Sequence, residues 1–293
     1  MKKLFIGIIS LLLAVTLTAC GGKTERDDKT LLVAATSKPH GDILEEAKNI
    51  LKDDYDIDLE IKILDDYYIF NRSLNDGDVD ANFFQHVPFF EKDIKDNKYD
   101  LVNAGGVHIE PFGFYSKQIK NINELKKNDI VVISNSVADH GRILAILDEA
   151  GIIELDDKVK VQDATIEDIK TNRLNLEFKE IKPELLTNAY KNDEGALIAI
   201  NGNYAIDAGL NPTKDAILLE SADESNPYVN IVACQKGHEN DKKIKALVAV
   251  LQSQKIKDFI TNTYSDGSVI PVKKRCLGIF FYYGDCVDTE NNI

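Results

Sequence analysis

Three polar side chains stand where the charged groups of an amino acid could be bound. Arg142 lies near the predicted start of a helix that follows an apolar strand. Its guanidinium can bind a carboxylate through two parallel hydrogen bonds, and the free N–H groups of a helix N-terminus attract the same anion. Asn201 and Asn203 open another helix after a strand, and each amide can both donate and accept. Together they suit a carboxylate and an ammonium, although each alone is more typical of a surface arginine or a helix cap.

Aromatic and polar residues are mixed in two segments that follow strands, residues 80–88 and 108–115. Aromatic rings in such positions can line a pocket for an apolar side chain. Ordinary core packing produces the same composition, and we expect it for Phe84 and Phe114.

Metal binding and catalysis have weaker support. Histidines from several segments, with Glu110 as a carboxylate ligand, could meet in space as a metal site, but no two histidines are three or four residues apart. The chain has no G-x-S-x-G or H-E-x-x-H motif and no phosphate-binding glycine loop. We therefore expect no metal, no other cofactor and no enzymatic activity. The histidines are His40, His86, His108, His140 and His238.

These side chains need a scaffold of short buried strands and amphipathic helices. Residues 31–35, 129–134 and 195–200 are apolar runs, which favours strands that are covered on both faces. Residues 40–52 and 141–150 carry apolar residues at helical spacing. The alternation predicts an α/β fold with largely parallel sheets, in which ligands bind beyond the carboxyl ends of the strands.

The first twenty residues predict export and lipid attachment. Two lysines precede an apolar run at 4–17, and small residues precede Cys20, a pattern that is typical of a cleaved signal peptide at 1–19. A cysteine at this point resembles the bacterial lipobox, which implies a thioether-linked diacylglycerol on Cys20 and a location on the extracytoplasmic face of the cell membrane. An uncleaved anchor helix is the alternative. The polar residues 20–29 are expected to form a flexible tether.

The charge of the chain excludes some partners. The formal net charge is −14, and cleavage of 1–19 would remove two lysines and no acidic residue, which makes it −16. So acidic a protein is a poor candidate for binding nucleic acid or anionic lipid through charge, so the acyl chains have to supply the membrane affinity. Cys234 lies in an apolar run and is expected to be a buried thiol, whereas Cys276 and Cys286 fit either a disulfide or two free thiols.

Several strings in the same segments are similar to a known family. The sequence resembles the NlpA lipoproteins, the methionine-binding lipoproteins of ABC importers, over about residues 31–272. The matching strings are ATSKPH (35–40), DANFFQH (80–86), HIEP (108–111), GR (141–142), INGNYA (200–205), AGLNP (208–212) and ESNPY (224–228).

The resemblance implies a two-lobed fold like that of type II periplasmic binding proteins, which closes on a ligand by hinge motion. Lobe one would comprise residues 30–110 and 226–272, and lobe two residues 111–225. The chain would cross between the lobes at about 110–114 and 224–228.

The resemblance also implies a function. A monomeric, lipid-anchored protein would capture L-methionine, or a methionine-containing dipeptide, between the lobes and deliver it to an ABC permease. Arg142 and Asn201 would hold the backbone of the amino acid. The residues that would surround the thioether side chain are Tyr67, Phe83, His86, His108 and Tyr115.

This chain also departs from the family pattern. Asp139 stands where the family commonly has asparagine, and a carboxylate there could bind a ligand ammonium but would repel a carboxylate. Phe112 replaces a small aliphatic residue or methionine. Residues 273–293 extend beyond the usual end of the family and are expected to be disordered or loosely packed. A metal-binding or adhesive surface lipoprotein on the same scaffold is the alternative function.

Overall fold

The computed structural model describes residues 27–221 and 226–272. The predicted signal peptide with Cys20, most of the predicted tether, and the extension at 273–293 with its two cysteines lie outside the described residues. Contacts between Cα atoms divide the chain after Thr30, and the fold described below is that of the chain from Leu31 onward. Within the described part of the chain, no helix is long and apolar enough to cross a membrane.

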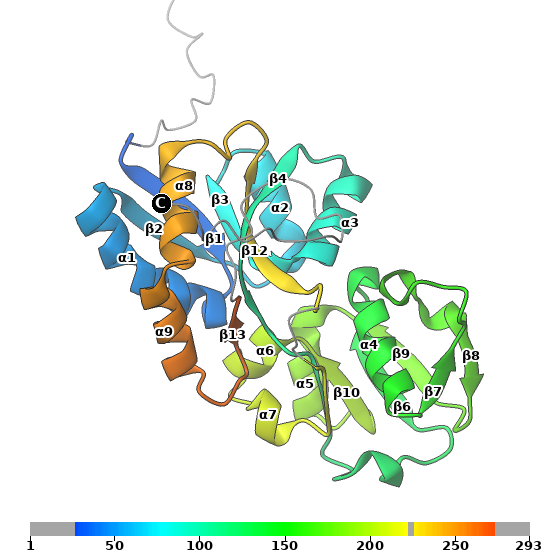
Figure 1. Ribbon diagram of the computed structural model, residues 1–293. Coiled ribbons are helices and arrows are strands. Elements are labelled where there is room, and N and C mark those ends of the chain that lie inside the picture. Colours follow the sequence, from blue (N-terminus) through cyan, green and yellow to red (C-terminus); the bar gives the residue numbers. More distant parts are fainter. Residues whose placement is uncertain (1–26, 222–225, 273–293) are drawn as a thin grey trace, which may run out of the picture. The chain divides into compact units, whose positions relative to one another are not determined.

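The first of two sheets takes its strands from both ends of the described chain (Figure 1). Its six strands lie in the order β13-β4-β12-β3-β1-β2. β1 runs parallel to β3, whereas β12 runs antiparallel to both β3 and β4. The strands are β1 (Thr30–Ala35), β2 (Asp58–Ile63), β3 (Ala81–His86), β4 (Leu101–Ile109), β12 (Val229–Gln235) and β13 (Ile270–Pro271).

Helices cover both faces of this sheet. Leu44 of α1 and Leu247 of α8 belong to the core on one face, and Phe70 of α2 and Phe89 of α3 belong to the core on the other. This double burial explains why residues 31–35 form an uninterrupted apolar run. The helices are α1 (Asp42–Tyr55), α2 (Tyr67–Asn75), α3 (Val87–Asn97), α8 (Lys242–Leu251) and α9 (Gln254–Thr263), and a π-helical turn at Ser37–Gly41 precedes α1.

The second sheet has five strands in the order β11-β5-β10-β6-β9. β6 runs parallel to β9 and β10, and β5 runs antiparallel to β10 and β11. Leu144 of α4 packs in the core on one face with Val131, while Leu186 of α5 packs on the other face with Val132. Alternate residues of β6 thus pack into the cores on opposite faces of the sheet.

The elements of the second sheet and its surroundings follow one another between residues 113 and 219. The strands are β5 (Gly113–Tyr115), β6 (Ile130–Ser134), β9 (Glu177–Ile181), β10 (Leu197–Ile200) and β11 (Leu218–Leu219), beside a two-stranded pair of β7 (Ile153–Leu155) and β8 (Ile169–Asn172). The helices are α4 (Val137–Glu149), α5 (Leu186–Lys191), α6 (Gly202–Asp207) and α7 (Pro212–Asp215), with 3₁₀ turns at Ile122–Glu124, Val161–Asp163, Ile166–Asp168 and Pro183–Leu185.

The predicted α/β class is confirmed by this arrangement. The expectation of largely parallel sheets is wrong, because β5, β11, β12 and β13 pair with their neighbours in antiparallel fashion. The chain passes from the first sheet to the second between β4 and β5, and it returns between β11 and β12. The residue boundaries of the two lobes stay predictions.

Arg142 does not lie at the start of its helix, as the sequence had suggested. α4 begins at Val137, after the cap residue Ser136, so Arg142 lies in the second turn. The free N–H groups of a helix N-terminus belong to the first four residues, and the backbone N–H of Arg142 therefore lies inside the helical ladder. The prediction began the helix at residue 141 because polar residues and Gly141 interrupt the apolar pattern before it.

Gly141 allows α4 to pack closely against the 3₁₀ turn at Val161–Asp163. A Cβ atom at this position would lie 2.3 Å from the carbonyl oxygen of Val161 and 3.0 Å from the backbone of Gln162. Backbone atoms cannot turn aside as a flexible side chain can. We therefore expect Gly141→Ala to lower the free energy of unfolding by roughly 1–3 kcal/mol.

Urea unfolding followed by circular dichroism measures this loss. Glu149→Ala, at an exposed position of the same helix, is the matched control and should change the free energy of unfolding by less than about 0.5 kcal/mol. Equal effects of the two substitutions would contradict the packing argument.

Candidate ligand-binding site

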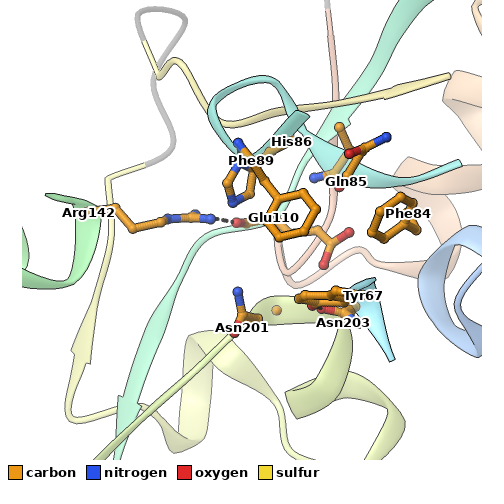
Figure 2. Close-up of a pocket in the computed structure, with 11 residues that line it drawn as sticks. Tyr67, Phe84, Gln85, His86, Phe89, Glu110, Arg142, Asn201 and Asn203 are labelled. Atoms are coloured by element: carbon orange, nitrogen blue, oxygen red, sulfur yellow. Dashed lines mark hydrogen bonds between the residues drawn. The ribbon is translucent and has the colours of Figure 1, made fainter. Parts of the chain in front are cut away.

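A small pocket lies among residues from both sheets and from the segment that links them (Figure 2). The space between its walls is about 350 Å³, part of which is open solvent. Arg142 lies on one side of the pocket, and Tyr67 and Phe84 lie on the opposite side. The lining residues are Tyr67, Phe84, Gln85, His86, Phe89, Glu110, Arg142, Asn201, Gly202, Asn203 and Asn230.

The guanidinium of Arg142 is buried and held from several directions. It lies between two rings, with its Cζ atom 5.0 Å from the ring centroid of Phe112 and 4.2 Å from that of Tyr228. Nε donates to Oε1 of Glu220 at 3.1 Å, and Nη2 donates to Oε2 of the same carboxylate. Nη2 also donates to the backbone carbonyl of Glu110 at 3.0 Å, the bond drawn in Figure 2. Burial lowers the pKa of Arg142, but the nearby Glu220 carboxylate outweighs it, so the net shift is upward.

This arrangement changes the predicted role of the arginine. The sequence suggested that both parallel donors of Arg142 were available to a ligand carboxylate. In the structure the Nε and Nη2 edge is taken by Glu220. Among the described residues, no hydrogen bond is assigned to Nη1, so this nitrogen is the donor left for a ligand.

A second group of polar side chains surrounds Asp139. The ring of His86 accepts a hydrogen bond at Nδ1 from the backbone N–H of Phe89 (3.1 Å), which leaves its proton on Nε2 to donate to Oδ1 of Asp139 (3.1 Å). Asn201 donates to Oδ2 of Asp139 at 3.3 Å. Burial raises the pKa of Asp139, but the bond from His86 and the charge of Arg142 outweigh it, and the net shift is downward. Asp139 is therefore a buried, ionised carboxylate.

Asn201 precedes α6 but does not cap it. Its side chain makes no capping hydrogen bond, and its Oδ1 atom is buried without a partner among the described residues. An unsatisfied buried acceptor is costly, and a ligand donor would satisfy it. Asn203 lies inside α6 and accepts a hydrogen bond from the Tyr67 hydroxyl at 2.5 Å.

Aromatic rings form the apolar side of the pocket. The Tyr67 ring stacks on Tyr204 with centroids 5.0 Å apart, and it lies 5.7 Å from Phe84 and 5.8 Å from Phe89. Phe84 in turn stacks on Phe70 at 3.9 Å. The rings are therefore fixed by their neighbours and present a rigid apolar wall.

Glu110 and two histidines form a cluster behind the pocket. Oε1 of Glu110 lies 2.8 Å from Nε2 of His108 and 3.4 Å from Nε2 of His40. Burial lowers the pKa of His40 to about 4 and that of His108 to about 3, and it raises the pKa of Glu110. Both imidazoles are thus neutral at neutral pH. His108 can donate from Nε2 to the carboxylate, and His40 can donate from Nε2 to Oδ1 of Asn230 at 3.1 Å.

The same cluster could hold a divalent metal ion. One ligand atom from each of His40, His108 and Glu110 lies within 4.8 Å of the others, and neutral imidazoles and a carboxylate are suitable ligands. The hydroxyl oxygen of Thr36 lies 2.7 Å from Nδ1 of His40, where it can fix the orientation of that ring. Sequence spacing did not indicate this cluster, because the π-helical turn at Ser37–Gly41 and β4 bring its histidines together only in the fold.

The structure brings five of the predicted site residues to the pocket surface. Asp139 lies directly behind His86 and Asn201. Phe83 and His108 lie deeper, in contact with each other at a centroid distance of 5.4 Å. Tyr115 lies in the core of the second sheet, 6.2 Å from Tyr190, and does not line the pocket. The five at the surface are Tyr67, His86, Arg142, Asn201 and Asn203.

Sequence reasoning did not single out the other lining residues, although Phe84, Gln85 and Glu110 lie in the two segments expected to line a pocket. Phe84 was expected to be a core residue, and it both packs on Phe70 and faces the pocket. Asn230 carried a usable signal, because it is a polar residue inside the apolar run of β12. The lining residues that were not predicted are Phe84, Gln85, Phe89, Glu110, Gly202 and Asn230.

The buried histidines give the protein a measurable acid sensitivity. His108 has an ordinary pKa of 6.5 in the unfolded chain and about 3 in the folded chain, so unfolding takes up a proton between these values. Stability should therefore fall as the pH is lowered from about 6.5 to 4. Glutamine keeps an N–H group near the position of Nε2 but does not titrate, so His108→Gln should reduce this loss.

Thermal unfolding at a series of pH values measures the effect. His238→Gln, at an exposed histidine, should leave the pH dependence of the melting temperature as in the wild type. A His108→Gln protein that loses as much stability in acid as the wild type would refute the assignment.

The chain is similar in sequence and in structure to known proteins. Residues 31–273 match the family model described as NlpA lipoprotein. The chain is 50% identical to the methionine-binding lipoprotein MetQ of Bacillus subtilis (strain 168) over 277 residues, which are 94% of this chain and 100% of that protein.

Solved structures show the same two-lobed fold. A lipoprotein of Bacillus subtilis subsp. subtilis str. 168 superposes with a TM-score of 0.81 at 52% identity, over 84% of this chain and 99% of that chain. A nutrient binding protein from Burkholderia cenocepacia, solved bound to methionine, superposes with a TM-score of 0.77 at 30% identity, over 82% of this chain and 99% of that chain. The two-lobed fold predicted from the resemblance is thereby confirmed, and the chain belongs to the NlpA lipoprotein family.

Proposed function

We propose that this protein is an extracytoplasmic solute-binding lipoprotein that captures L-methionine, or a methionine-containing dipeptide, and delivers it to an ABC permease. The pocket carries the proposal, because it combines polar groups for a zwitterionic head at one side with an aromatic wall at the other. Arg142 and the unpartnered oxygen of Asn201 face the head, and Tyr67, Phe84 and Phe89 form the wall. Relatives whose names state methionine binding support it.

Methionine suits the aromatic wall for physical reasons. Burial of its side chain contributes roughly 1.5–3 kcal/mol. Its thioether sulfur can also contact ring edges, which adds about 0.3–1.5 kcal/mol for each favourable contact. A lysine or aspartate side chain would gain neither term and would have to be desolvated beside the rings of Tyr67 and Phe89.

Two contacts between the lobes would favour the closed form around a ligand. Tyr67 of the first lobe donates to Asn203 of the second, and His86 of the first lobe donates to Asp139 of the second. All four side chains line the pocket or lie directly behind it. Closure and ligand enclosure would therefore be coupled, as expected of a hinged binding protein. The role is one of binding and release, without catalysis.

Isothermal titration with L-methionine, other amino acids and Gly-Met tests the ligand, after unfolding and refolding to remove any carried-over solute. We expect L-methionine or Gly-Met to bind, and Arg142→Ala to weaken binding by roughly 1.5–3 kcal/mol, because a charge-assisted hydrogen bond is lost. Arg173→Ala, at an exposed turn outside the pocket, is the matched control. Absence of binding to all of these ligands would refute the proposal.

A metal-binding role is the second candidate, and the cluster of His40, His108 and Glu110 favours it. Titration of the ligand-free protein with Zn²⁺ separates the two functions. Zinc binding that is lost in His108→Gln, together with no response to methionine, would favour the metal.

The N-terminal pattern supports a lipid anchor on Cys20, which would keep a monomeric binding protein beside its permease at the membrane. One acyl chain gives only marginal binding to a membrane, whereas the two chains of a diacylglycerol would hold the protein there. In a bacterial host we expect the wild type in the membrane fraction and in the detergent-rich phase of a phase-partition assay. Cys20→Ser should move the protein out of the detergent-rich phase or leave the precursor uncleaved. Unchanged processing and partition would contradict the anchor.

A further inference from the structure

The buried carboxylates around Arg142 outnumber its single positive charge. The side chains of Glu110, Asp139 and Glu220 are 6%, 1% and 10% exposed. Arg142 is the one arginine or lysine among the described residues that line the pocket. Buried charges are stable only when they are paired or neutralised, so this group of side chains favours an additional positive charge from a ligand.

Glu220 is a fixed part of the second lobe. Its backbone N–H donates to the carbonyl of Phe112 at 2.8 Å, which continues the pairing of β11 with β5. Its Oε2 atom accepts a hydrogen bond from the backbone N–H of Phe112 at 3.1 Å. The orientation of the Glu220 carboxylate is thus fixed by the edge of the sheet as well as by Arg142.

Glu220 therefore sets which part of the guanidinium can meet a ligand. Of the five N–H groups of an arginine, those on Nε and Nη2 point to Glu220 and to the carbonyl of Glu110. The rings of Phe112 and Tyr228 cover the two faces. A ligand carboxylate is left with Nη1, and with a positive charge that Glu220 has already balanced.

Two of the other polar groups near the ligand head are acceptors. Oδ1 of Asn201 is buried without a partner among the described residues, and Glu110 presents a carboxylate to the pocket. Asp139 lies behind Asn201, within 3.3 Å of its amide nitrogen. Acceptors and carboxylates bind an ammonium and repel an anion.

We propose that Glu220 is a specificity-determining residue, which neutralises Arg142 and so makes the pocket select ligands that carry an ammonium over ligands that carry only a carboxylate. This role rests on the proposed amino-acid-binding function. It makes the ammonium of the ligand, rather than the carboxylate, the main group that the pocket recognises. The ammonium is held by the acceptors around Asn201 and Glu110, and the carboxylate is a secondary contact at Nη1 of Arg142.

Two fragments of methionine test this without adding bulk to the ligand. 4-(Methylthio)butanoate lacks the amino group, and 3-(methylthio)propylamine lacks the carboxylate. We expect the wild type to bind the amine more tightly than the acid. In Glu220→Gln, which keeps the length of the side chain but not its charge, the ratio of the two affinities should move toward the acid by at least about tenfold.

Two further variants serve as controls. Glu220→Asp keeps the charge and should keep the preference for the amine, even if all ligands bind more weakly. Glu154→Gln, at a half-exposed carboxylate far from the lining residues, should leave the ratio unchanged. Circular dichroism melts establish that each variant is folded before titration.

The outcomes separate this inference from the proposed function. An unchanged ratio in Glu220→Gln, or equal weakening of both fragments, would overturn the role of Glu220 while methionine binding by the wild type stood. Failure of the wild type to bind methionine or Gly-Met would instead count against the proposed function, and it is measured before any variant is compared.

Discussion

The buried guanidinium of Arg142 is the constraint on which the site depends. A charge removed from water needs partners, and this one has them at Nε and Nη2, while Nη1 makes no hydrogen bond with the described residues. Glu220 pairs with one edge, the carbonyl of Glu110 accepts at Nη2, and the rings of Phe112 and Tyr228 cover the faces. These partners lie on or beside the segments where the chain crosses between the two sheets, so the arginine links these segments to the pocket.

The two lobes supply different chemistry to one pocket. The first lobe contributes the aromatic wall, which is fixed by stacking of Phe84 on Phe70 and of Tyr67 on Tyr204 from the second lobe. The second lobe contributes Arg142 and the asparagines of α6. Because neither half forms the site alone, a ligand with one charged end and one apolar end is the kind that both lobes contact together.

The buried carboxylates give this pocket an acidic character that a single arginine does not suggest. Asp139, the departure from the family pattern, is ionised because His86 and Arg142 offset its burial. Burial raises the pKa of Glu110, which stands between two imidazoles that burial keeps neutral. Selection by charge therefore depends on the whole group of side chains rather than on one residue.

The sequence by itself determined the α/β class, because it follows from local apolar patterns, and it named five of the residues that line the pocket. The export signal and the ligand-binding roles of these residues stay predictions. The sequence placed the start of α4 too late, because local patterns do not fix helix caps. Tyr115, which the resemblance gave to the site, lies in the core of the second sheet in this structure. Only the tertiary structure decided that Glu220 pairs with Arg142, 78 residues away, and that His40 and His108 meet at Glu110. Such pairings depend on how two sheets bring distant segments together, and no local spacing encodes them.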